Sequence, residues 1–201
     1  MQNLLYHSTP IIGIKSLIPL SHFGTFAAAL ENYGRKFIDI NVEARAKWRA
    51  HVLDHELLAC RISCDAKSIG PIPDWSSPAP MALLSKICCL FPQIISNEEF
   101  EEFKVGCSCY ETYDDSATEK LLSLFNVNNV HYVSYINHIE DRDSISVCVI
   151  DPSILIIEER LQFTFDQICS SVKKSILYTN SNKRNFADEL LGLLQDRIKI
   201  K

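Results

Sequence analysis

The sequence has no excess of basic charge: its 201 residues include 20 Lys and Arg and 25 Asp and Glu, for a formal net charge of -5. A broad nucleic-acid-binding face needs a basic surface, so the composition argues against such a face and leaves room only for a local patch. The chain also lacks a run of about 18 apolar residues, the length of a membrane span. Its opening, MQNLLYHSTP, lacks the charged and apolar regions of a signal peptide. These absences predict a soluble, cytoplasmic protein with no membrane partner, acting in the producing cell or in a target cell after specialised export.

Signatures of several enzyme classes are absent as well. The chain has no glycine-rich G-x-G-x-x-G pattern, no P-loop and no G-x-S-x-G nucleophile elbow. It also has no internal repeat and no low-complexity tract. The sequence therefore does not point to a Rossmann-type cofactor site, a P-loop nucleotide site or a serine hydrolase of the elbow type.

Cysteine, by contrast, is plentiful. A chain that is neither short nor visibly secreted usually keeps its thiols reduced. We therefore expect reduced, mostly buried thiols rather than disulfides. The eight cysteines are at positions 60, 64, 88, 89, 107, 109, 148 and 169.

Two stretches contain residue types that bind metals. His51 and His55 lie four residues apart and precede Cys60 and Cys64, and residues 107–109 form a C-x-C. The histidine and cysteine spacing matches no standard zinc site, and a C-x-C alone is weak evidence. We therefore expect surface histidines and core thiols here, and no metal.

The first half of the chain predicts short strands and helices in mixed order. Strands are expected at residues 3–7 and 22–25, and a helix from Phe26 with a candidate break at Gly34. LLACRIS alternates as a strand does, whereas four prolines and a glycine in KSIGPIPDWSSPAP predict a loop. MALLSKICCLF is apolar around its circumference and predicts a buried helix.

The second half continues the mixed order. NEEFEEFK predicts a solvated turn, and Ser116 with Glu119 forms a capping-type signature that opens a helix. VHYVSYI and SISVCVI predict a hairpin, ILIIEERLQFTF a further strand, and residues 184–199 an amphipathic helix. Without regular strand-helix alternation this order favours an α+β fold, and the length suits a single domain over residues 1–201.

Polar residues gather at the predicted strand ends, as they do around a ligand cleft. They occur in YHST, in SHFGTFAAA and in YINHIEDRDSISVCVIDPS. The order and spacing of these motifs, with LLACRIS and the loop holding Asp74 and Trp75 between them, resemble ADP-ribosyltransferase-like domains of bacteria and phages. The resemblance covers roughly residues 3–157 and leaves out the C-terminal helix. It implies a split antiparallel β-sheet with surrounding helices, whose two halves enclose an NAD cleft.

The first motif is implied to hold the nicotinamide end of NAD. His7 matches the histidine that hydrogen-bonds the nicotinamide-side ribose, and the adjoining backbone at Ser8 and Thr9 would hold the carboxamide. Ser8 stands where the family usually has glycine.

The second motif is implied to stack on the nicotinamide ring. His22 and Phe23 match the strand whose aromatic residue makes this contact, and the resemblance leaves open which ring stacks. Thr25, Ala28 and Ala29 match the start of the following helix, and at Thr25 a hydroxyl and backbone N–H groups can meet an anion. Gly24, a point of close backbone approach in the predicted strand, is also expected to contact the cofactor.

The third motif is implied to supply the catalytic carboxylate. Tyr135, Asn137 and Glu140 match a Y-x-N-x-x-E pattern, which makes Glu140 the candidate and Tyr135 and Asn137 expected cofactor-binding residues. Other branches place a glutamate at the start of the next strand, where this chain has Ser144, Ile145 and Ser146.

These residue types suit cleavage of the bond between ribose and nicotinamide. The reaction passes through an oxocarbenium-like state, which a carboxylate near the anomeric carbon and hydrogen bonds to the 2-hydroxyl group stabilise. Glu140 would supply the first and His7 the second. Because nicotinamide already carries its positive charge in NAD, its departure needs no general acid.

The predicted function is therefore that of a toxin-like effector with NAD as substrate. It would transfer ADP-ribose to an unidentified acceptor, a protein in the first instance, or hydrolyse NAD. The strand without a glutamate leaves open a catalytically inactive NAD-binding or interaction module of the same fold. A third hypothesis is a cysteine-dependent hydrolase that pairs an exposed thiol with His131 or His138. Acceptor choice is expected to depend on loops at residues 65–80 and 97–115.

Overall fold

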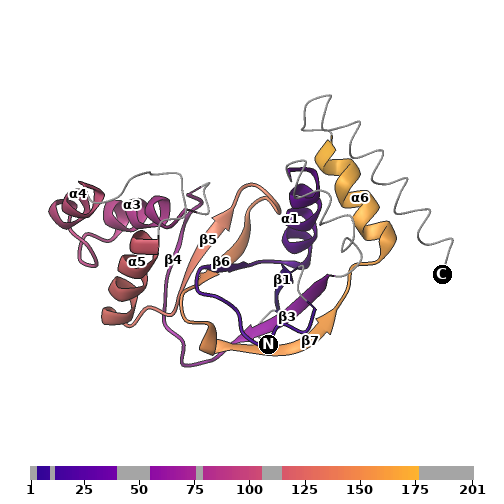
Figure 1. The fold of residues 1–201 in the computed structure, drawn as a ribbon, viewed down its shortest axis with the longest axis horizontal. Helices are drawn as coiled ribbons and strands as arrows, with labels where there is room; N and C mark the ends of the chain where they lie inside the picture. The colour runs from indigo at the N-terminus through magenta and orange to yellow at the C-terminus, as the bar shows by residue number, and fades with distance from the viewer. Residues whose placement is uncertain (1–3, 10–11, 40–54, 76–78, 106–114, 177–201) are drawn as a thin grey trace. The chain divides into compact units, whose positions relative to one another are not determined.

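The described strands belong to two sheets (Figure 1). This computed structural model describes residues 4–9, 12–39, 55–75, 79–105 and 115–176. The chain divides into two compact units: unit 1 comprises Met1–Lys15, Gly24–Arg61 and Ile157–Lys201, and unit 2 comprises Ser16–Phe23 and Ile62–Ile156. Sheets and helices in mixed order make the architecture mixed α and β, compatible with the predicted α+β class. The predicted helix at 184–199 lies outside the described residues.

Unit 1 is built on a three-stranded sheet with the order β1-β3-β7. β1 (Leu5–Thr9) runs antiparallel to β3 (Glu56–Ile62), the middle strand, and most of β7 (Leu155–Leu161) belongs to the same unit. The helices α1 (Phe26–Asp39) and α6 (Phe165–Ile176) lie side by side. The core of unit 1 joins both helices to the sheet and contains Ala29, Tyr33, Leu57, Phe163, Ile168 and Val172.

Unit 2 is built on a four-stranded sheet with the order β2-β6-β5-β4. β5 (Tyr132–Asn137) and β6 (Ser144–Val149) form the predicted hairpin, and β2 (Ser21–Phe23) pairs antiparallel with β6. β4 (Ser68–Pro73) runs parallel to β5, so this sheet is mixed rather than purely antiparallel as predicted. The short 3-10 helix η1 (Pro152–Ile154) follows β6, at the predicted turn.

Unit 2 has three helices, α3 (Pro80–Leu90), α4 (Asn97–Val105) and α5 (Asp115–Val127). Of these, α4 packs against α3 on the side away from the sheet (Figure 1). The apolar α3 is buried over most of its length, as predicted. The core contains Leu84, Ile87, Leu121, Phe125, Val133 and Cys148 among others. No helix in the described part of the chain has the length and hydropathy required to cross a membrane.

The prediction of a loop at KSIGPIPDWSSPAP is wrong for its first half, which is β4. Proline is tolerated in edge strands and at bulges, and β4 is the edge strand of its sheet with a register shift between Ile69 and Ile72. Gly70 and Pro71 fall within this irregular part. Gly70 has φ +105°, and a Cβ at this position would lie 2.2 Å from the carbonyl oxygen of Ser134. Only glycine fits there.

Two helix starts were missed in the sequence, and both carry a reciprocal capping pattern. The acidic stretch predicted as a turn is α4, where the N–H of Glu99 donates to Ser96 Oγ and the N–H of Ser96 donates to Glu99 Oε2. The predicted strand ILIIEERLQFTF ends at Leu161, and the same exchange between Thr164 and Gln167 starts α6. The predicted cap Ser116 lies inside the first turn of α5, which begins at Asp115.

Gly34 is not the predicted break in α1, which continues through it. A Cβ at this position would lie 2.3 Å from Ser171 Oγ on α6. The Ser171 hydroxyl donates to the carbonyl oxygen of Leu30, 2.9 Å away. Gly34 therefore allows the two helices to approach closely.

We expect Gly34→Ala to destabilise the protein, although alanine normally favours a helix by up to about 1 kcal/mol over glycine. Overpacking against Ser171 should lower the free energy of unfolding by about 1–3 kcal/mol, measured by urea denaturation. Ala27→Gly, at an exposed position of the same helix, is the control, because glycine should destabilise the protein there. A more stable Gly34→Ala variant would contradict the close contact.

Candidate functional site

One face of the unit 2 sheet becomes polar toward one end of its strands. Tyr135 pairs with Ser146 across β5 and β6, and His22 pairs with Cys148 across β2 and β6. Alternate residues of a strand share a face. His22, Tyr135, Asn137 and Ser146 therefore lie on the same face of this sheet.

Three aromatic rings form a cluster on this face. The ring centroids of His22 and Trp75 are 5.6 Å apart, those of His22 and Tyr135 are 5.7 Å apart, and those of Trp75 and Tyr135 are 4.8 Å apart. Nδ1 of His22 lies 3.0 Å from the hydroxyl oxygen of Tyr135. Tyr135 is buried, whereas His22 and Trp75 are partly exposed. This aromatic cluster therefore offers ring surface to a ligand.

The hydroxyl group of Tyr135 is buried and lies near negatively charged groups. Burial raises its pKa, and the nearby carboxylates of Glu140 and, less strongly, Asp74 raise it further, as does Cys148. A hydrogen bond from Ser146 opposes these effects. Two acidic side chains are therefore close enough to the aromatic cluster to affect a charge on it.

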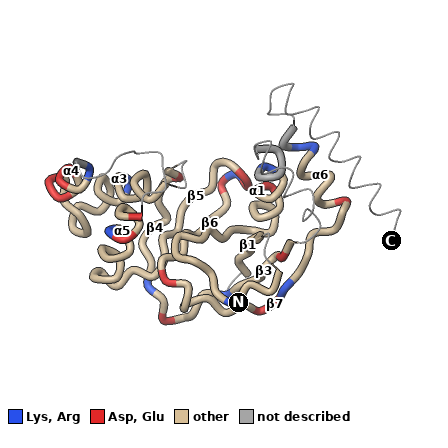
Figure 2. Tube along the Cα trace, viewed as in Figure 1, with Lys and Arg blue, Asp and Glu red and all other residues tan. Residues whose placement is uncertain are grey.

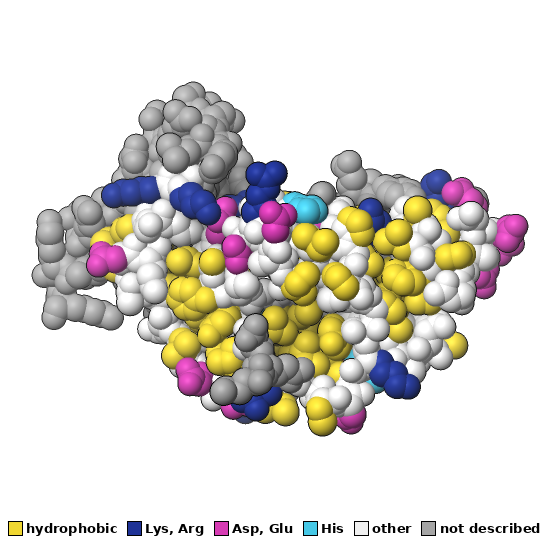
Figure 3. All heavy atoms as spheres, turned by 180° about the vertical axis from the view of Figure 1, so that it is seen from behind, with side chains coloured by type: hydrophobic (Ala, Val, Ile, Leu, Met, Phe, Trp, Pro, Cys, Tyr) yellow, Lys and Arg dark blue, Asp and Glu magenta, His cyan; other side chains and the backbone are white. Residues whose placement is uncertain are grey.

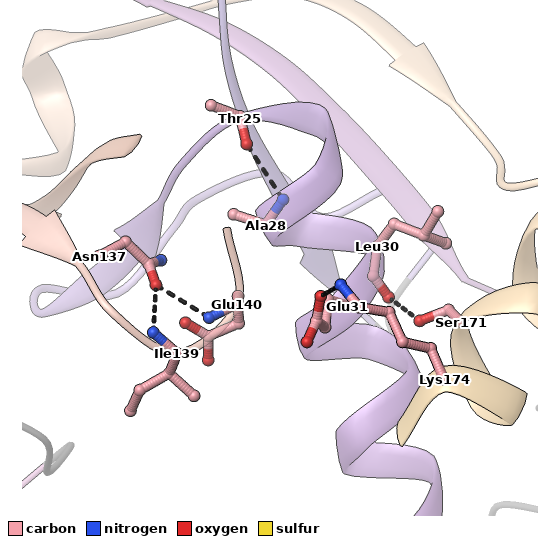
Figure 4. Close-up of polar contacts among 9 residues, drawn as sticks. All are labelled: Thr25, Ala28, Leu30, Glu31, Asn137, Ile139, Glu140, Ser171 and Lys174. Carbon is pink, nitrogen blue, oxygen red and sulfur yellow. Dashed lines mark hydrogen bonds and ion pairs between the residues drawn. The ribbon is translucent and has the colours of Figure 1, made fainter. Parts of the chain in front are cut away.

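Glu140 belongs to the turn between β5 and β6, and Asn137 fixes this turn (Figure 4). Oδ1 of Asn137 accepts hydrogen bonds from the N–H groups of Ile139, at 3.0 Å, and Glu140, at 2.9 Å. Nδ2 of Asn137 donates to Ser146 Oγ at 3.0 Å. Asn137 is 2% exposed and Ser146 is 1% exposed. The backbone of Glu140 is thus held by a buried pair of side chains.

Other contacts complete the turn. Asp143 has φ +65°, in the left-handed region that Asp and Asn tolerate, and its N–H donates to the carbonyl oxygen of Asn137. The N–H of His138 donates to Asp74 Oδ2 at 3.4 Å. The side chains of His138 and Asp143 are exposed and 3.8 Å apart. The turn is therefore an ordered structure that also contacts the segment after β4.

Five of the predicted NAD-binding residues belong to unit 1: His7, Ser8, Thr9, Gly24 and Thr25. His7, Ser8 and Thr9 are in β1, where Ser8 and Thr9 are buried and His7 is partly exposed. Tyr6 and Gly24 exchange two backbone hydrogen bonds of 2.8 and 3.1 Å, so the β1 strand lies beside the start of α1.

Thr25 caps the helix α1. Its hydroxyl oxygen accepts a hydrogen bond of 3.1 Å from the N–H of Ala28 (Figure 4). An N-cap of this kind satisfies one of the free N–H groups at the helix start. The Thr25 hydroxyl thus has a local structural role beside the anion contact predicted for it.

The geometry of β2 distinguishes the two rings predicted to stack on nicotinamide. Phe23 is 1% exposed, and it points to the opposite face of β2 from His22 because successive side chains alternate. His22 is partly exposed and belongs to the aromatic cluster. His22 is therefore the ring that can meet a ligand on this face.

Three residues of this site were not predicted as site residues: Asp74, Trp75 and Ser146. The position of Ser146 follows from the predicted hairpin once its register is known, because Asn137 pairs with Ser144 and Tyr135 with Ser146. The sequence has no comparable signal for Trp75, because only the tertiary fold brings it beside His22.

The residues of the metal and thiol hypotheses have structural contacts. His55 is buried and its Nε2 accepts the N–H of Phe163 at 2.8 Å, so it is not the surface histidine expected. Nδ1 of His131 accepts the N–H of Lys67 at 2.9 Å. Within the described residues no group of three His, Cys, Asp or Glu side chains is arranged to hold a metal ion. His51 and the C-x-C at 107–109 lie outside the described residues.

Burial makes four thiols poor nucleophiles. It raises the pKa of Cys60 to about 11 and that of Cys148 to about 12, and it also raises the pKa values of Cys88 and Cys169. A thiol with a raised pKa is protonated at neutral pH and reacts slowly. Among the six described cysteines, three are buried and Cys64 and Cys89 are exposed, so the prediction of mostly buried thiols holds for half of them.

Basic residues are spread over the described chain. Figure 2 shows Lys and Arg positions in both units, and α4 is mainly acidic. On the face drawn in Figure 3, Lys and Arg side chains lie singly or in small groups among acidic and hydrophobic ones. These two views contain no extended basic surface among the described residues. The lack of a broad nucleic-acid-binding face stays a prediction.

Comparison with known proteins found no similar protein. No family model matches the chain, and no curated protein or solved structure is significantly similar to it. The roles of the site residues therefore depend on their own chemistry and geometry.

The raised pKa of Tyr135 predicts a loss of stability at alkaline pH. In the unfolded chain tyrosine ionises with a pKa near 10, whereas folded Tyr135 stays protonated to higher pH. Its contribution to the free energy of unfolding is therefore complete below about pH 10 and is lost as the pH rises toward the folded pKa.

We expect Tyr135→Phe to show a shallower decrease in unfolding free energy than the wild type between about pH 9.5 and 11.5. Urea unfolding at several pH values measures this difference. Tyr132→Phe, on the same strand, controls for the loss of a phenol. Parallel curves for the wild type and Tyr135→Phe would count against the raised pKa.

Proposed function

We propose that this chain binds NAD and transfers its ADP-ribose group to an acceptor, or to water, with release of nicotinamide. The observation that carries the proposal is the position of Glu140. Its turn is held by a hydrogen bond to Asn137, and its negative charge raises the pKa of Tyr135 in the aromatic cluster. A carboxylate beside aromatic rings suits both the cationic pyridinium ring of NAD and the cation that forms at the ribose.

The reaction breaks the bond between the anomeric carbon of the ribose and the ring nitrogen of nicotinamide. The bonding electron pair leaves with nicotinamide, which becomes neutral, and the ribose carbon becomes oxocarbenium-like. The carboxylate of Glu140 stabilises this cation. A nucleophilic oxygen or nitrogen of the acceptor, or water, then bonds to the carbon and loses its proton. Asp74 lies near enough to Tyr135 to influence its ionisation and is a candidate to accept that proton.

The aromatic cluster is proposed to hold the nicotinamide ring. His22 and Trp75 are its partly exposed members. Buried Phe23, also predicted for this role, does not present its ring on that face. His7 stays the predicted partner of the nicotinamide-side ribose, with Ser8 and Thr9 beside it.

The two sheets, each accompanied by helices, support the finer proposal of an ADP-ribosyltransferase-like fold. The proposed acceptor is a protein. Of the loops expected to select it, residues 68–73 form β4 and residues 97–105 form α4. Trp75, a member of the aromatic cluster, and its neighbour Asp74 follow β4 directly.

Glu140→Gln should lower the rate of nicotinamide release about 100-fold or more, because the amide cannot neutralise the developing cation. The assay incubates purified protein with biotin-labelled NAD and cell lysate, and follows both label transfer and nicotinamide release. Asp143→Asn is the matched control, since it removes a charge from the same turn, and asparagine tolerates its left-handed conformation.

Full activity of Glu140→Gln would move the catalytic carboxylate elsewhere. A wild type that binds NAD and neither transfers label nor releases nicotinamide would favour the inactive NAD-binding module. The buried Ser146, at the strand position where a glutamate is found in other branches, is the observation that keeps this second candidate.

Trp75→Ala should weaken NAD binding roughly 5- to 30-fold, the equivalent of about 1–2 kcal/mol for one ring facing a cation. Trp75→Phe keeps a ring and should lose less affinity. Titration of NAD, followed by calorimetry, measures both dissociation constants. Equal affinity of Trp75→Ala and the wild type would remove Trp75 from the binding site.

A further inference from the structure

Both polar atoms of the Asn137 side-chain amide form hydrogen bonds. Its oxygen accepts the N–H groups of Ile139 and Glu140, and its nitrogen donates to Ser146. A flipped amide would direct N–H donors at the two turn N–H groups, which can only donate. The turn therefore fixes the orientation of Asn137, and Ser146 holds the other end of its amide.

Burial makes the loss of any of these hydrogen bonds costly. Asn137 and Ser146 are both almost completely buried, so water cannot replace a lost partner. Leaving one buried polar group without its bond costs about 1–3 kcal/mol. The turn therefore has one strongly preferred backbone geometry at Glu140.

Ser146 also lies beside the aromatic cluster. It pairs with Tyr135 across β5 and β6, and the Tyr135 hydroxyl lies 3.0 Å from Nδ1 of His22. Because alternate residues of a strand share a face, the Asn137 and Ser146 pair and the aromatic cluster are neighbours on one face of this sheet.

From this arrangement we infer that Asn137 and Ser146 are positioning residues that hold the Glu140 carboxylate in register with the aromatic cluster, an inference that rests on the proposed function. The Ser146 hydroxyl accepts from Asn137, and the carboxylate comes from the turn that Asn137 holds. A displacement of about 1 Å at a reacting group can lower a rate about 100-fold.

The test compares variants of the full chain in nicotinamide release and in amide hydrogen exchange. Asn137→Ala removes the acceptor for both turn amides and should lower kcat by roughly 100-fold while the KM for NAD changes by less than about twofold. Asn137→Asp retains an acceptor for the turn amides but loses the donor to Ser146 and adds a buried charge, so it should restore only part of kcat. Ser146→Ala should lower kcat by roughly 10-fold, and Ser146→Thr, which keeps the hydroxyl, should restore it.

Hydrogen exchange of the Ile139 and Glu140 amides, measured by NMR, separates positioning from chemistry. These amides should exchange faster in Asn137→Ala and Ser146→Ala, and at the wild-type rate in the inactive Glu140→Gln variant. Asn128→Ala, which removes an exposed amide contact at the end of α5, is the control and should change neither readout. Ser146→Ala keeps the test decisive where Asn137→Ala does not fold, as monitored by circular dichroism.

The failures of the two ideas are distinguishable. A wild type without nicotinamide release would overturn the proposed function and this inference together. An active, Glu140-dependent wild type whose kcat is unchanged in Asn137→Ala and Ser146→Ala would overturn the inference alone. Unchanged exchange of both amides in those variants would also overturn it.

Discussion

The hydrogen bond between Asn137 and Ser146 is the interaction on which the candidate site depends. It joins the last residue of β5 to a buried position of β6 and leaves the Asn137 oxygen to hold the turn that carries Glu140. A polar pair this deeply buried has no substitute in solvent. The same two side chains therefore link the two strands to each other and to the turn.

The site lies where the hydrophobic core of unit 2 ends. Val133, Tyr135 and Asn137 follow one another on the same face of β5, and they change from apolar through amphipathic to polar. Val133 packs in the core with residues of α3 and α5, and Tyr135 is the last member of β5 in that core. Tyr135 thus has its ring in the core and its hydroxyl in the polar network, which suits a residue with one apolar and one polar end.

Much of the fold was predictable because local patterns decided it. The β5 and β6 hairpin, the strand β3 and the buried helix α3 all follow from periodicity and composition. The strand β4 did not, because its prolines are acceptable only at a sheet edge, and the sequence does not say which strand is at the edge. The helix α6 carried a readable signal in Thr164 and Gln167.

The candidate site was predictable in part. Asn137 and Glu140 are three residues apart in sequence, so a local motif can identify both, and the structure places them in one turn. The contacts of His22 with Trp75 and Tyr135 join strands and a loop from distant parts of the chain. Only tertiary packing creates such contacts. The buried state of Phe23 was hidden for the same reason, since alternation gives two faces without saying which one the core covers.

The edge strand β4 has a consequence for self-association. An unpaired strand edge is a template on which another chain can add a strand. Proline has no N–H to donate, and β4 contains Pro71 and Pro73 beside a register shift, while the opposite edge, β2, is only three residues long. Within the described residues, neither border of this sheet offers the long, regular ladder that aggregation and amyloid growth require. The prolines that made β4 resemble a loop in the sequence therefore also protect the sheet from strand addition.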